Sequence, residues 1–304
     1  MQDVLLTTQK YPPLRFEIWK AGLKLINTIE ALKMLLEPLK KAQQKIAIVP
    51  TMGALHKGHV SLIHVAQQQA EFVVCTIFVN PTQFTDPKDL ERYPRPLEQD
   101  IKTLEEAGCD VVFMPSVKEM YPSFPEPEDW HINLGPAEFL LEGEFRKGHY
   151  QGVTQIVKKL FDAVQPDLAF FGQKDYQQVL MIEKMIAHFQ LPIEIISCPI
   201  IREKDGLAMS SRNIHLSPAD RRNAVVLSRA LRYVQDHYET GTIAGLEQAA
   251  KQMISNTPGV ELDYFIIADP KTLQPQHAAD LDGSVVLVAA KVGQTRLIDN
   301  TILQ

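Results

Sequence analysis

Two histidines, His56 and His59, lie three residues apart in the segment PTMGALHKGH (residues 50–59), which follows a short β-branched run at residues 45–49. If a helix begins here, this spacing places both imidazoles on one face at its positively polarised N-terminus. Two imidazole donors, together with the free N–H groups of the helix, would bind the oxygens of a phosphate group. The alternatives are a metal-binding pair or two surface histidines, although no acidic residue completes a zinc-protease spacing.

Two amide side chains follow a second apolar run at residues 72–79. Asn80 and Gln83 stand in the segment FVNPTQF (residues 78–84). An amide both donates and accepts hydrogen bonds, so the pair suits a ligand with hydroxyl and carboxylate groups. Asn-Pro also begins many ordinary turns, and the segment alone does not indicate a function.

A third segment, FFGQKDYQQ (residues 170–178), follows the apolar run at residues 168–171. Gly172 would let a ligand approach the backbone, and Lys174 supplies a point charge for phosphates. Asp175 could hold a ribose hydroxyl or a metal-bound water. The alternative is a solvated turn between a strand and a helix.

A fourth segment, MSSRN (residues 209–213), follows an Asp-Gly turn at residues 205–206. The hydroxyls of Ser210 and Ser211 and the guanidinium of Arg212 suit a β/γ-phosphate group, and the arginine would neutralise charge on the leaving group. A loop of this kind could act as a mobile lid. The alternative is a plain connection between domains.

These four segments need a scaffold that brings them together. Apolar runs that alternate with helical patterns predict a parallel sheet covered on both faces, and ligands bind beyond the carboxyl ends of such strands. We therefore predict a Rossmann-like, doubly wound α/β domain over residues 1–201, in which residues 1–24 form an extra N-terminal segment. Strands are expected at residues 45–49, 72–79, 111–114, 168–171 and 193–197, and helices at 25–45 (interrupted by Pro38), 58–71, 96–107, 153–164 and 176–189.

The pattern changes after residue 201. Ser217 and Pro218 are typical of a helix start, because serine caps the N-terminus and proline is tolerated in the first turn. A second helix is expected at residues 243–255, followed by strands at residues 262–268, 285–292 and 295–299. We predict a smaller C-terminal α+β lid domain with an antiparallel sheet over residues 202–304.

Composition limits the class of protein. The chain has 304 residues, 45% of them hydrophobic, and a formal net charge of −6, which argues against a nucleic-acid partner. Cys75, Cys109 and Cys198 are distant from one another and form no C-x-x-C pair, so we expect buried, reduced thiols and a cytoplasmic location. No apolar stretch reaches the roughly 18 residues of a membrane span, and the N-terminus lacks the pattern of a secretion signal.

The sequence resembles the pantothenate synthetase (pantoate–β-alanine ligase) family of H-x-G-H nucleotidyltransferases. The segments PTMGALHKGH, FVNPTQF, GHYQGV, FFGQKDYQQ and MSSRN stand in the family's order over about nine-tenths of the chain. The resemblance implies ATP and Mg²⁺, with no direct protein ligand to the metal, and (R)-pantoate and β-alanine as reactants. It also implies a pantoyl-adenylate intermediate, release of AMP and pyrophosphate, a place in vitamin B5 and coenzyme A biosynthesis, and a homodimer.

The same resemblance assigns roles to particular residues. Catalytic roles fall to His56, His59, Lys174, Ser210, Ser211 and Arg212. ATP contacts fall to Met52, His59, Gly172, Lys174, Asp175, Ile201, Met209, Ser210, Ser211 and Arg212. Pantoate contacts fall to Met52, Asn80, Gln83, Tyr93 and Gln178, and Arg146, His149 and Tyr150 lie near the substrates.

The chain departs from the family pattern at Thr82, Gln173 and residues 146–147, and Thr82 is expected to alter the pantoate pocket slightly. Two other functions fit the motifs. One is a different H-x-G-H nucleotidyltransferase, which would need more basic residues near the acceptor than FVNPTQF offers. The other is a non-catalytic nucleotide sensor, in which the catalytic positions would be lost, yet all of them are present.

Overall fold

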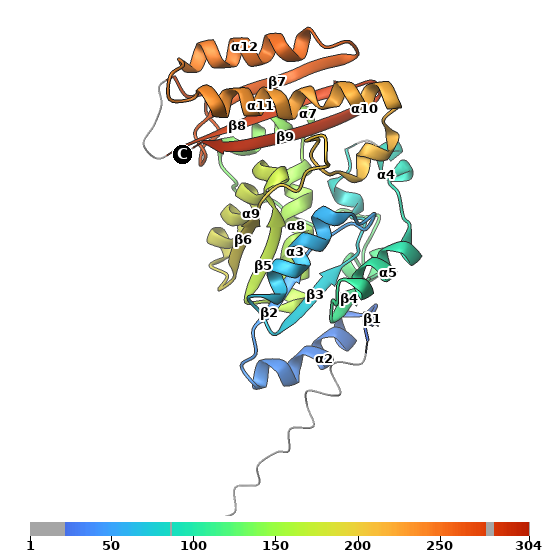
Figure 1. The fold of residues 1–304 in the computed structure, drawn as a ribbon. Coiled ribbons are helices and arrows are strands. Elements are labelled where there is room, and N and C mark those ends of the chain that lie inside the picture. The colour runs from blue at the N-terminus through green and yellow to red at the C-terminus, as the bar shows by residue number, and fades with distance from the viewer. Residues whose placement is uncertain (1–21, 86, 278–282, 304) are drawn as a thin grey trace, which may run out of the picture.

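The computed structural model describes residues 22–85, 87–277 and 283–303, so the expected extra segment at residues 1–24 lies outside them apart from its last three residues. Two β-sheets organise the chain, and the smaller one stands above the larger one in Figure 1. Within the described ranges, no helix is both long enough and apolar enough to cross a membrane.

The larger sheet has six parallel strands in the order β1-β4-β3-β2-β5-β6. The chain runs outward from β2 to β3 and β4 and then returns to β5 on the other side of β2. The carboxyl ends of β2 and β5 therefore form a topological switch point, where ligands bind in open α/β sheets. The strands are β1 (Lys24–Ile26), β2 (Ile46–Val49), β3 (Phe72–Thr76), β4 (Val111–Phe113), β5 (Leu168–Gly172) and β6 (Glu194–Cys198).

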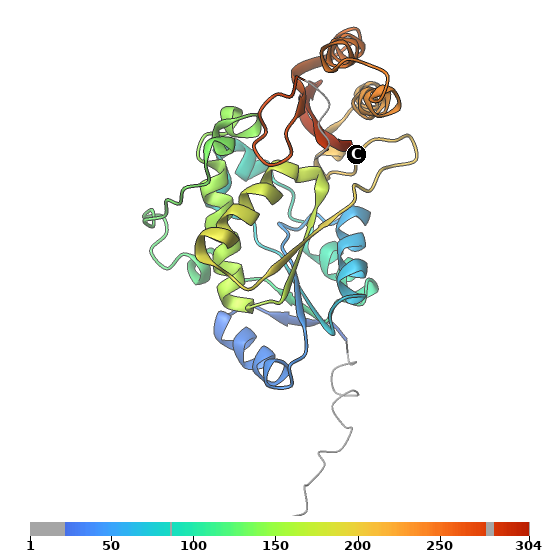
Figure 2. The ribbon, with the colours of Figure 1, turned by 90° about the vertical axis from the view of Figure 1, so that its left-hand side faces the viewer.

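Helices cover both faces of this sheet (Figure 2). Alternate residues of one strand enter opposite layers, because side chains point to the two faces in turn. Ile46 and Ile48 of β2 pack with α2, α8 and α9, whereas Ala47 and Val49 pack with α3 and α5. The helices are α2 (Ile29–Lys41), α3 (Lys57–Gln67), α5 (Leu97–Glu106), α8 (His149–Val164) and α9 (Tyr176–Phe189). The predicted fold class is confirmed.

The structure differs in two ways from the prediction for residues 25–45. Apolar spacing predicts a helix over residues 25–45, but residues 24–26 form strand β1 and the helix begins at Ile29, after the N-cap Thr28. Pro38 does not end this helix, because it lies in the last turn and its missing N–H removes only one hydrogen bond.

Short helices occupy the connections between the main elements. They are η1 (Pro81–Gln83), α4 (Pro87–Arg92), α6 (Val117–Met120), η2 (Pro136–Phe139), α7 (Glu142–Phe145), η3 (Gln173–Asp175) and η4 (Ser211–His215). The run expected to be a strand over residues 72–79 leaves the sheet after Thr76, and its last residues lead into η1.

The C-terminal part contains an antiparallel sheet in the order β7-β8-β9, with α11 and α12 packed on one face, as the sequence predicts. Ser217 caps α10 by accepting the Asp220 N–H, and Pro218 is its first residue. The elements are α10 (Pro218–Ala224), α11 (Val226–His237), α12 (Ile243–Ser255), β7 (Val260–Ala268), β8 (Ser284–Val292) and β9 (Thr295–Leu303).

The other face of this antiparallel sheet packs against the first part of the chain. Val285 and Leu287 of β8 belong to the same core cluster as the α8 and α9 side chains. Apolar side chains of the antiparallel sheet therefore pack against α8 and α9, which cover one face of the parallel sheet.

All three cysteines are free and buried, as expected. Burial raises the pKa of Cys75 and Cys109, the latter to about 12, so these thiols stay protonated.

Candidate active site

A cleft lies where the loops after β2, β3 and β5 face the C-terminal sheet. It opens to solvent and has a cavity volume of about 250 Å³. Every site residue predicted from the sequence lines it. They are Met52, His56, His59, Asn80, Gln83, Tyr93, Gly172, Lys174, Asp175, Gln178, Ile201, Met209, Ser210, Ser211 and Arg212.

Asp100 of α5 holds the loop that precedes α3. Its carboxylate accepts the N–H groups of Ala54 and Leu55, both at 2.8 Å. Gly53 has a φ of +78°, and a Cβ at this position would lie 2.8 Å from Asp100 Oδ2. Burial raises the pKa of Asp100, while the two N–H donors oppose that rise. Sequence reasoning missed this residue, although an acidic residue on the buried side of an amphipathic helix is a usable signal.

The two histidines form a reciprocal cap at the start of α3. His56 Nδ1 accepts the Gly58 N–H at 3.1 Å, and His59 Nδ1 accepts the His56 N–H at 3.2 Å. Both rings therefore carry their hydrogen on Nε2. Their centroids are 4.1 Å apart.

Both imidazoles are neutral near pH 7. Burial, and secondarily the Lys174 ammonium, lowers the pKa of His56 to about 4. Burial, followed by the neighbouring His56, lowers the pKa of His59 to about 3. The helix thus presents two fixed, neutral N–H donors rather than two cations.

Asn80 fixes the orientation of Gln83. Its Nδ2 donates to Gln83 Oε1 at 3.2 Å and to the Gly152 carbonyl at 3.1 Å, and its Oδ1 accepts the Tyr121 hydroxyl. Gln83 Nε2 points at Met52 Sδ, 3.0 Å away. A thioether is a weak acceptor, so a ligand oxygen can replace it at little cost. The contacts of Asn80 favour a positioning role.

Helix α8 supports this loop by direct backbone contact. A Cβ on Gly152 would lie 2.7 Å from the Thr82 carbonyl carbon. His149 donates from Nδ1 to the Gln83 carbonyl at 2.8 Å and accepts from Arg146 at Nε2. Burial, followed by the Arg146 charge, lowers the pKa of His149 to about 4. Two residues of the GHYQG motif, His149 and Gly152, therefore pack against the FVNPTQF loop.

Lys174 and Asp175 form an ion pair at the carboxyl end of β5, with 3.2 Å between Nζ and Oδ1. Burial raises the pKa of Asp175, but the Lys174 ammonium outweighs it and the pKa falls below its usual range. The Asp175 carboxyl group is therefore ionised near neutral pH.

The segment around MSSRN folds back across the cleft. The Met209 N–H donates to the Ile201 carbonyl at 3.0 Å, which places these two apolar side chains on neighbouring arms of a turn. Ser210 caps η4 by accepting the Arg212 N–H at 3.2 Å. The Arg212 guanidinium lies 3.6 Å from the Asp89 carboxylate of α4, so the loop reaches the opposite wall.

Two further predicted residues complete this wall. Tyr93 is buried, and burial raises the pKa of its hydroxyl. Gln178 lines the cleft without a hydrogen-bonding partner among the described residues, so its amide can meet a ligand.

Sequence reasoning missed a charged contact between the two parts of the chain. Glu142 of α7 accepts both Nη groups of Arg296 of β9, at 2.6 and 2.7 Å, and the Tyr264 hydroxyl at 2.9 Å. Arg296 also donates to Asp263 at 2.7 Å. Glu142 and Tyr264 line the cleft, as do Asp299 and Asn300.

Metal-ligating residues do not cluster in the described part of the chain. No group of three or more His, Cys, Asp or Glu side chains there could hold a metal ion.

Comparisons with known proteins identify one family. Residues 24–302 match the family model described as pantoate-beta-alanine ligase. The pantothenate synthetase of Koribacter versatilis is 45% identical over 284 residues, which cover 93% of this chain and 96% of the relative. That of Bacteroides fragilis is 44% identical over 279 residues, with coverages of 91% and 98%.

Solved structures agree with these sequence relatives. Pantothenate synthetase from Thermus thermophilus has a TM-score of 0.85 and 40% identity, covering 91% of this chain and 98% of its own. Pantoate-beta-alanine ligase from Francisella tularensis, crystallised with beta-gamma ATP and β-alanine, has a TM-score of 0.74 and 35% identity, with coverages of 92% and 98%.

Proposed function

The chain belongs to the pantoate-beta-alanine ligase family, and we propose that the cleft described above carries out both halves of that ATP-dependent condensation. The protein is a ligase that joins pantoate to β-alanine. In the first half, a carboxylate oxygen of pantoate attacks the α-phosphorus of ATP, and the bond to pyrophosphate breaks. In the second half, the amine of β-alanine attacks the acyl carbon of pantoyl adenylate, AMP leaves and the nitrogen loses a proton.

The observation that carries this mechanism is the pair of neutral imidazoles at the start of α3. His56 and His59 use Nδ1 to cap the helix, which leaves each Nε2–H free to donate to a phosphate oxygen. Donors that are already oriented stabilise charge that develops in the transition state without reorganising. Because their pKa values are about 4 and 3, they lose no donor capacity and gain no proton at neutral pH.

Charged and hydroxyl groups around the histidines suit the rest of ATP. We assign the β- and γ-phosphates to Ser210, Ser211 and Arg212, and further phosphate charge to Lys174. Gly172, Ile201 and Met209 are assigned to adenosine. Transfer at phosphorus depends mainly on positioning and charge neutralisation, which these residues can supply without a nucleophilic side chain.

The amide-lined end of the cleft suits pantoate. Gln83 and Gln178 each offer an amide to the carboxylate or hydroxyls, and Met52 and Tyr93 supply the walls. Asn80 acts through Gln83, because its own polar atoms are engaged by the protein.

A magnesium ion fits this cleft only with substrate phosphates as its main ligands. Of the three acids that line the cleft, Glu142 and Asp299 are paired with arginines, whereas Asp175 is paired with Lys174, which we assign to the phosphates. Mg²⁺ commonly binds through one or two carboxylates or their waters together with phosphates. Asp175 would hold a metal-bound water, and the ion would neutralise charge on the phosphates.

We also propose a domain boundary near residue 202, a C-terminal lid domain over residues 202–304 with a mobile loop at residues 203–213, a homodimer and a cytoplasmic location. The loop contains an Asp-Gly turn and contacts the opposite wall through Arg212. Equal protease sensitivity of the loop with and without ATP plus pantoate would contradict the lid. The resemblance to the family supports the dimer, which light scattering would test, and three buried free cysteines suit the cytoplasm.

Pyrophosphate release by the purified protein tests the mechanism. With ATP, Mg²⁺ and pantoate, we expect sustained release only when β-alanine is added, with equimolar AMP and pantothenate. His56→Ala and Lys174→Ala should each lower turnover about a hundred- to thousandfold if the variants fold. Absence of release from protein that binds ATP would contradict the proposed chemistry. The alternatives of a dinucleotide-forming enzyme and a non-catalytic sensor are not favoured by any contact in the cleft.

A further inference from the structure

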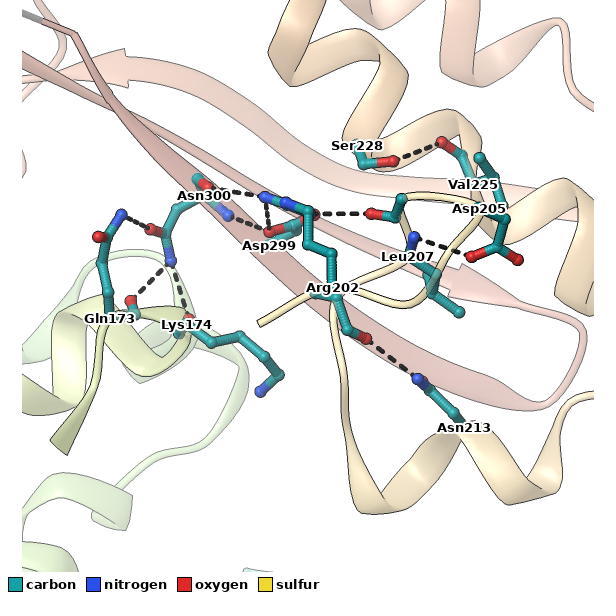
Figure 3. A network of polar contacts seen from close by, with 12 residues as sticks. Gln173, Lys174, Arg202, Asp205, Leu207, Asn213, Val225, Ser228, Asp299 and Asn300 are labelled. Atoms are coloured by element: carbon teal, nitrogen blue, oxygen red, sulfur yellow. Dashed lines mark hydrogen bonds and ion pairs between the residues drawn. The ribbon is translucent and has the colours of Figure 1, made fainter. Parts of the chain in front are cut away.

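Asn300 is a buried residue of β9 that bonds directly to the loop carrying Lys174. Only 1% of its surface is exposed. Its Nδ2 donates to the carbonyl oxygens of Gln173 and Lys174, both at 2.9 Å. Figure 3 shows the amide of Asn300 aimed at these two consecutive carbonyls, from a strand that belongs to the C-terminal sheet.

The side chain of Gln173 fixes which way this amide points. Gln173 Nε2 donates to Asn300 Oδ1 at 3.1 Å. With its oxygen held in this way, Asn300 must present its NH₂ group to the two carbonyls. The contact is a closed set of three hydrogen bonds between β9 and η3, rather than one incidental contact.

The neighbouring residue, Asp299, anchors the second phosphate-facing segment. Its carboxylate accepts two N–H groups of Arg202, at 2.6 and 3.0 Å, and also the Asn300 N–H at 2.8 Å. Arg202 begins the turn that leads to Ser210 and Arg212, and Figure 3 shows it beside β9. Two adjacent residues of one strand therefore hold the starts of both segments that we assign to the phosphates.

We propose that Asn300 is a positioning residue for the ATP phosphates, which acts by holding the backbone from which the Lys174 side chain extends. This inference rests on the proposed phosphate role of Lys174. The turn η3 is only three residues long, between the end of β5 and the start of α9, and the Asn300 amide engages the carbonyl oxygens of two of its residues. A lysine side chain is long and flexible, and a shift of its Cα moves the ammonium away from the phosphates.

The C-terminal sheet then forms part of the ATP site. Movement of the whole sheet away from β5 would break the Asn300 contacts and displace Lys174. The contacts of Asn300 therefore connect the position of β9 to the position of the Lys174 backbone.

The experiment compares Asn300→Ala and Asn300→Asp with wild type, in both the natural and the Lys174→Ala backgrounds. Turnover is followed as pyrophosphate release at saturating β-alanine, with ATP and pantoate varied separately. A displacement of about 1 Å commonly costs on the order of a hundredfold, so we expect a loss of about 10- to 100-fold in kcat/KM for ATP from Asn300→Ala. The KM for pantoate should change less than about twofold. Asn300→Asp should be at least as impaired, because carboxylate oxygens would face two carbonyl oxygens.

The Lys174→Ala background separates positioning from general damage. If Asn300 acts through Lys174, Asn300→Ala should cost less than about threefold there, since interacting sites are not additive. The same loss in both backgrounds would overturn the proposal. If Lys174→Ala itself has wild-type kinetics, the proposed phosphate role of Lys174 fails instead, which is a different result.

Two further variants control the experiment. Asn223 donates from Nδ2 to the Pro258 carbonyl at 2.8 Å in the same part of the chain, away from the cleft. Asn223→Ala should keep wild-type kinetics. Gln173→Ala removes only the contact to Asn300 Oδ1 and serves if Asn300→Ala does not fold. Gln173→Ala should lower kcat/KM for ATP, by less than Asn300→Ala does. Unchanged kinetics with ATP would count against the proposal.

Discussion

Replacing Gly152 by alanine should damage the pantoate end of the cleft while leaving the ATP end intact. The Cβ would lie 2.7 Å from the Thr82 carbonyl carbon and 2.9 Å from the Gln83 Cα. Both obstacles are backbone atoms, which cannot rotate away as a flexible side chain would. The Thr82 carbonyl oxygen would lie closer still to this Cβ. Because ordinary contacts begin at 3.4 Å, α8 and η1 must separate by about 1 Å.

The size of the effect follows from this geometry. Overpacking of a tight contact costs about 1–3 kcal/mol, and loss of the buried Asn80 bond to the Gly152 carbonyl adds about 1 kcal/mol. The higher helix propensity of alanine returns about 1 kcal/mol. We expect the free energy of unfolding to fall by about 1–3 kcal/mol, and kcat/KM for pantoate to fall on the order of a hundredfold as Gln83 moves.

Denaturant unfolding and steady-state kinetics with each substrate varied would test this prediction. The KM for ATP should stay near its wild-type value, because the loop before α3 is held by Asp100 instead. Gly245→Ala is the matched control, since a Cβ there meets one side-chain oxygen, Thr242 Oγ1, at 3.0 Å in a helix far along the chain. Wild-type stability and pantoate kinetics in Gly152→Ala would refute the claim that the two backbones are in tight contact.

Three more predictions follow from the charged and titratable groups. Between about pH 6.5 and pH 5 the fold should lose stability as pH falls, since unfolded histidine takes up a proton near pH 6.5, whereas folded His56 and His59 do so only near pH 4 and pH 3. Each contributes up to about 1.4 kcal/mol per pH unit in that window, and His56→Gln should reduce the measured slope. Asp100→Asn should cost about 1–3 kcal/mol and lower kcat/KM for ATP, because an amide cannot accept both loop N–H groups; unchanged ATP kinetics would contradict this. Glu142→Gln should lower the free energy of unfolding by about 2–3 kcal/mol, measured as a lower thermal unfolding temperature; this loss is smaller than for a fully buried pair because Arg296 is partly exposed. The double variant Glu142→Gln/Arg296→Met should regain part of this stability.

Much of the scaffold could be predicted because its signals are local. Buried parallel strands are apolar along their length, and the runs at β2, β4 and β5 stand out between helical patterns. In a parallel sheet, the loops after the strands meet at one edge. This rule predicts that the motifs in these loops lie close together. Strand β1 escaped prediction because three residues carry too little pattern, and because their spacing continues that of α2.

The chemical groups of the site, and the edge of the sheet where they gather, can be predicted because residue type and apolar periodicity are properties of short segments. How these groups are held depends on contacts between segments that lie far apart along the chain. Asp100 reaches Ala54 across 46 positions, Asn300 reaches Gln173 across 127, and Arg296 reaches Glu142 across 154. No local pattern encodes such partners, because a hydrogen bond depends on the distance between two atoms in the fold and not on their separation along the chain.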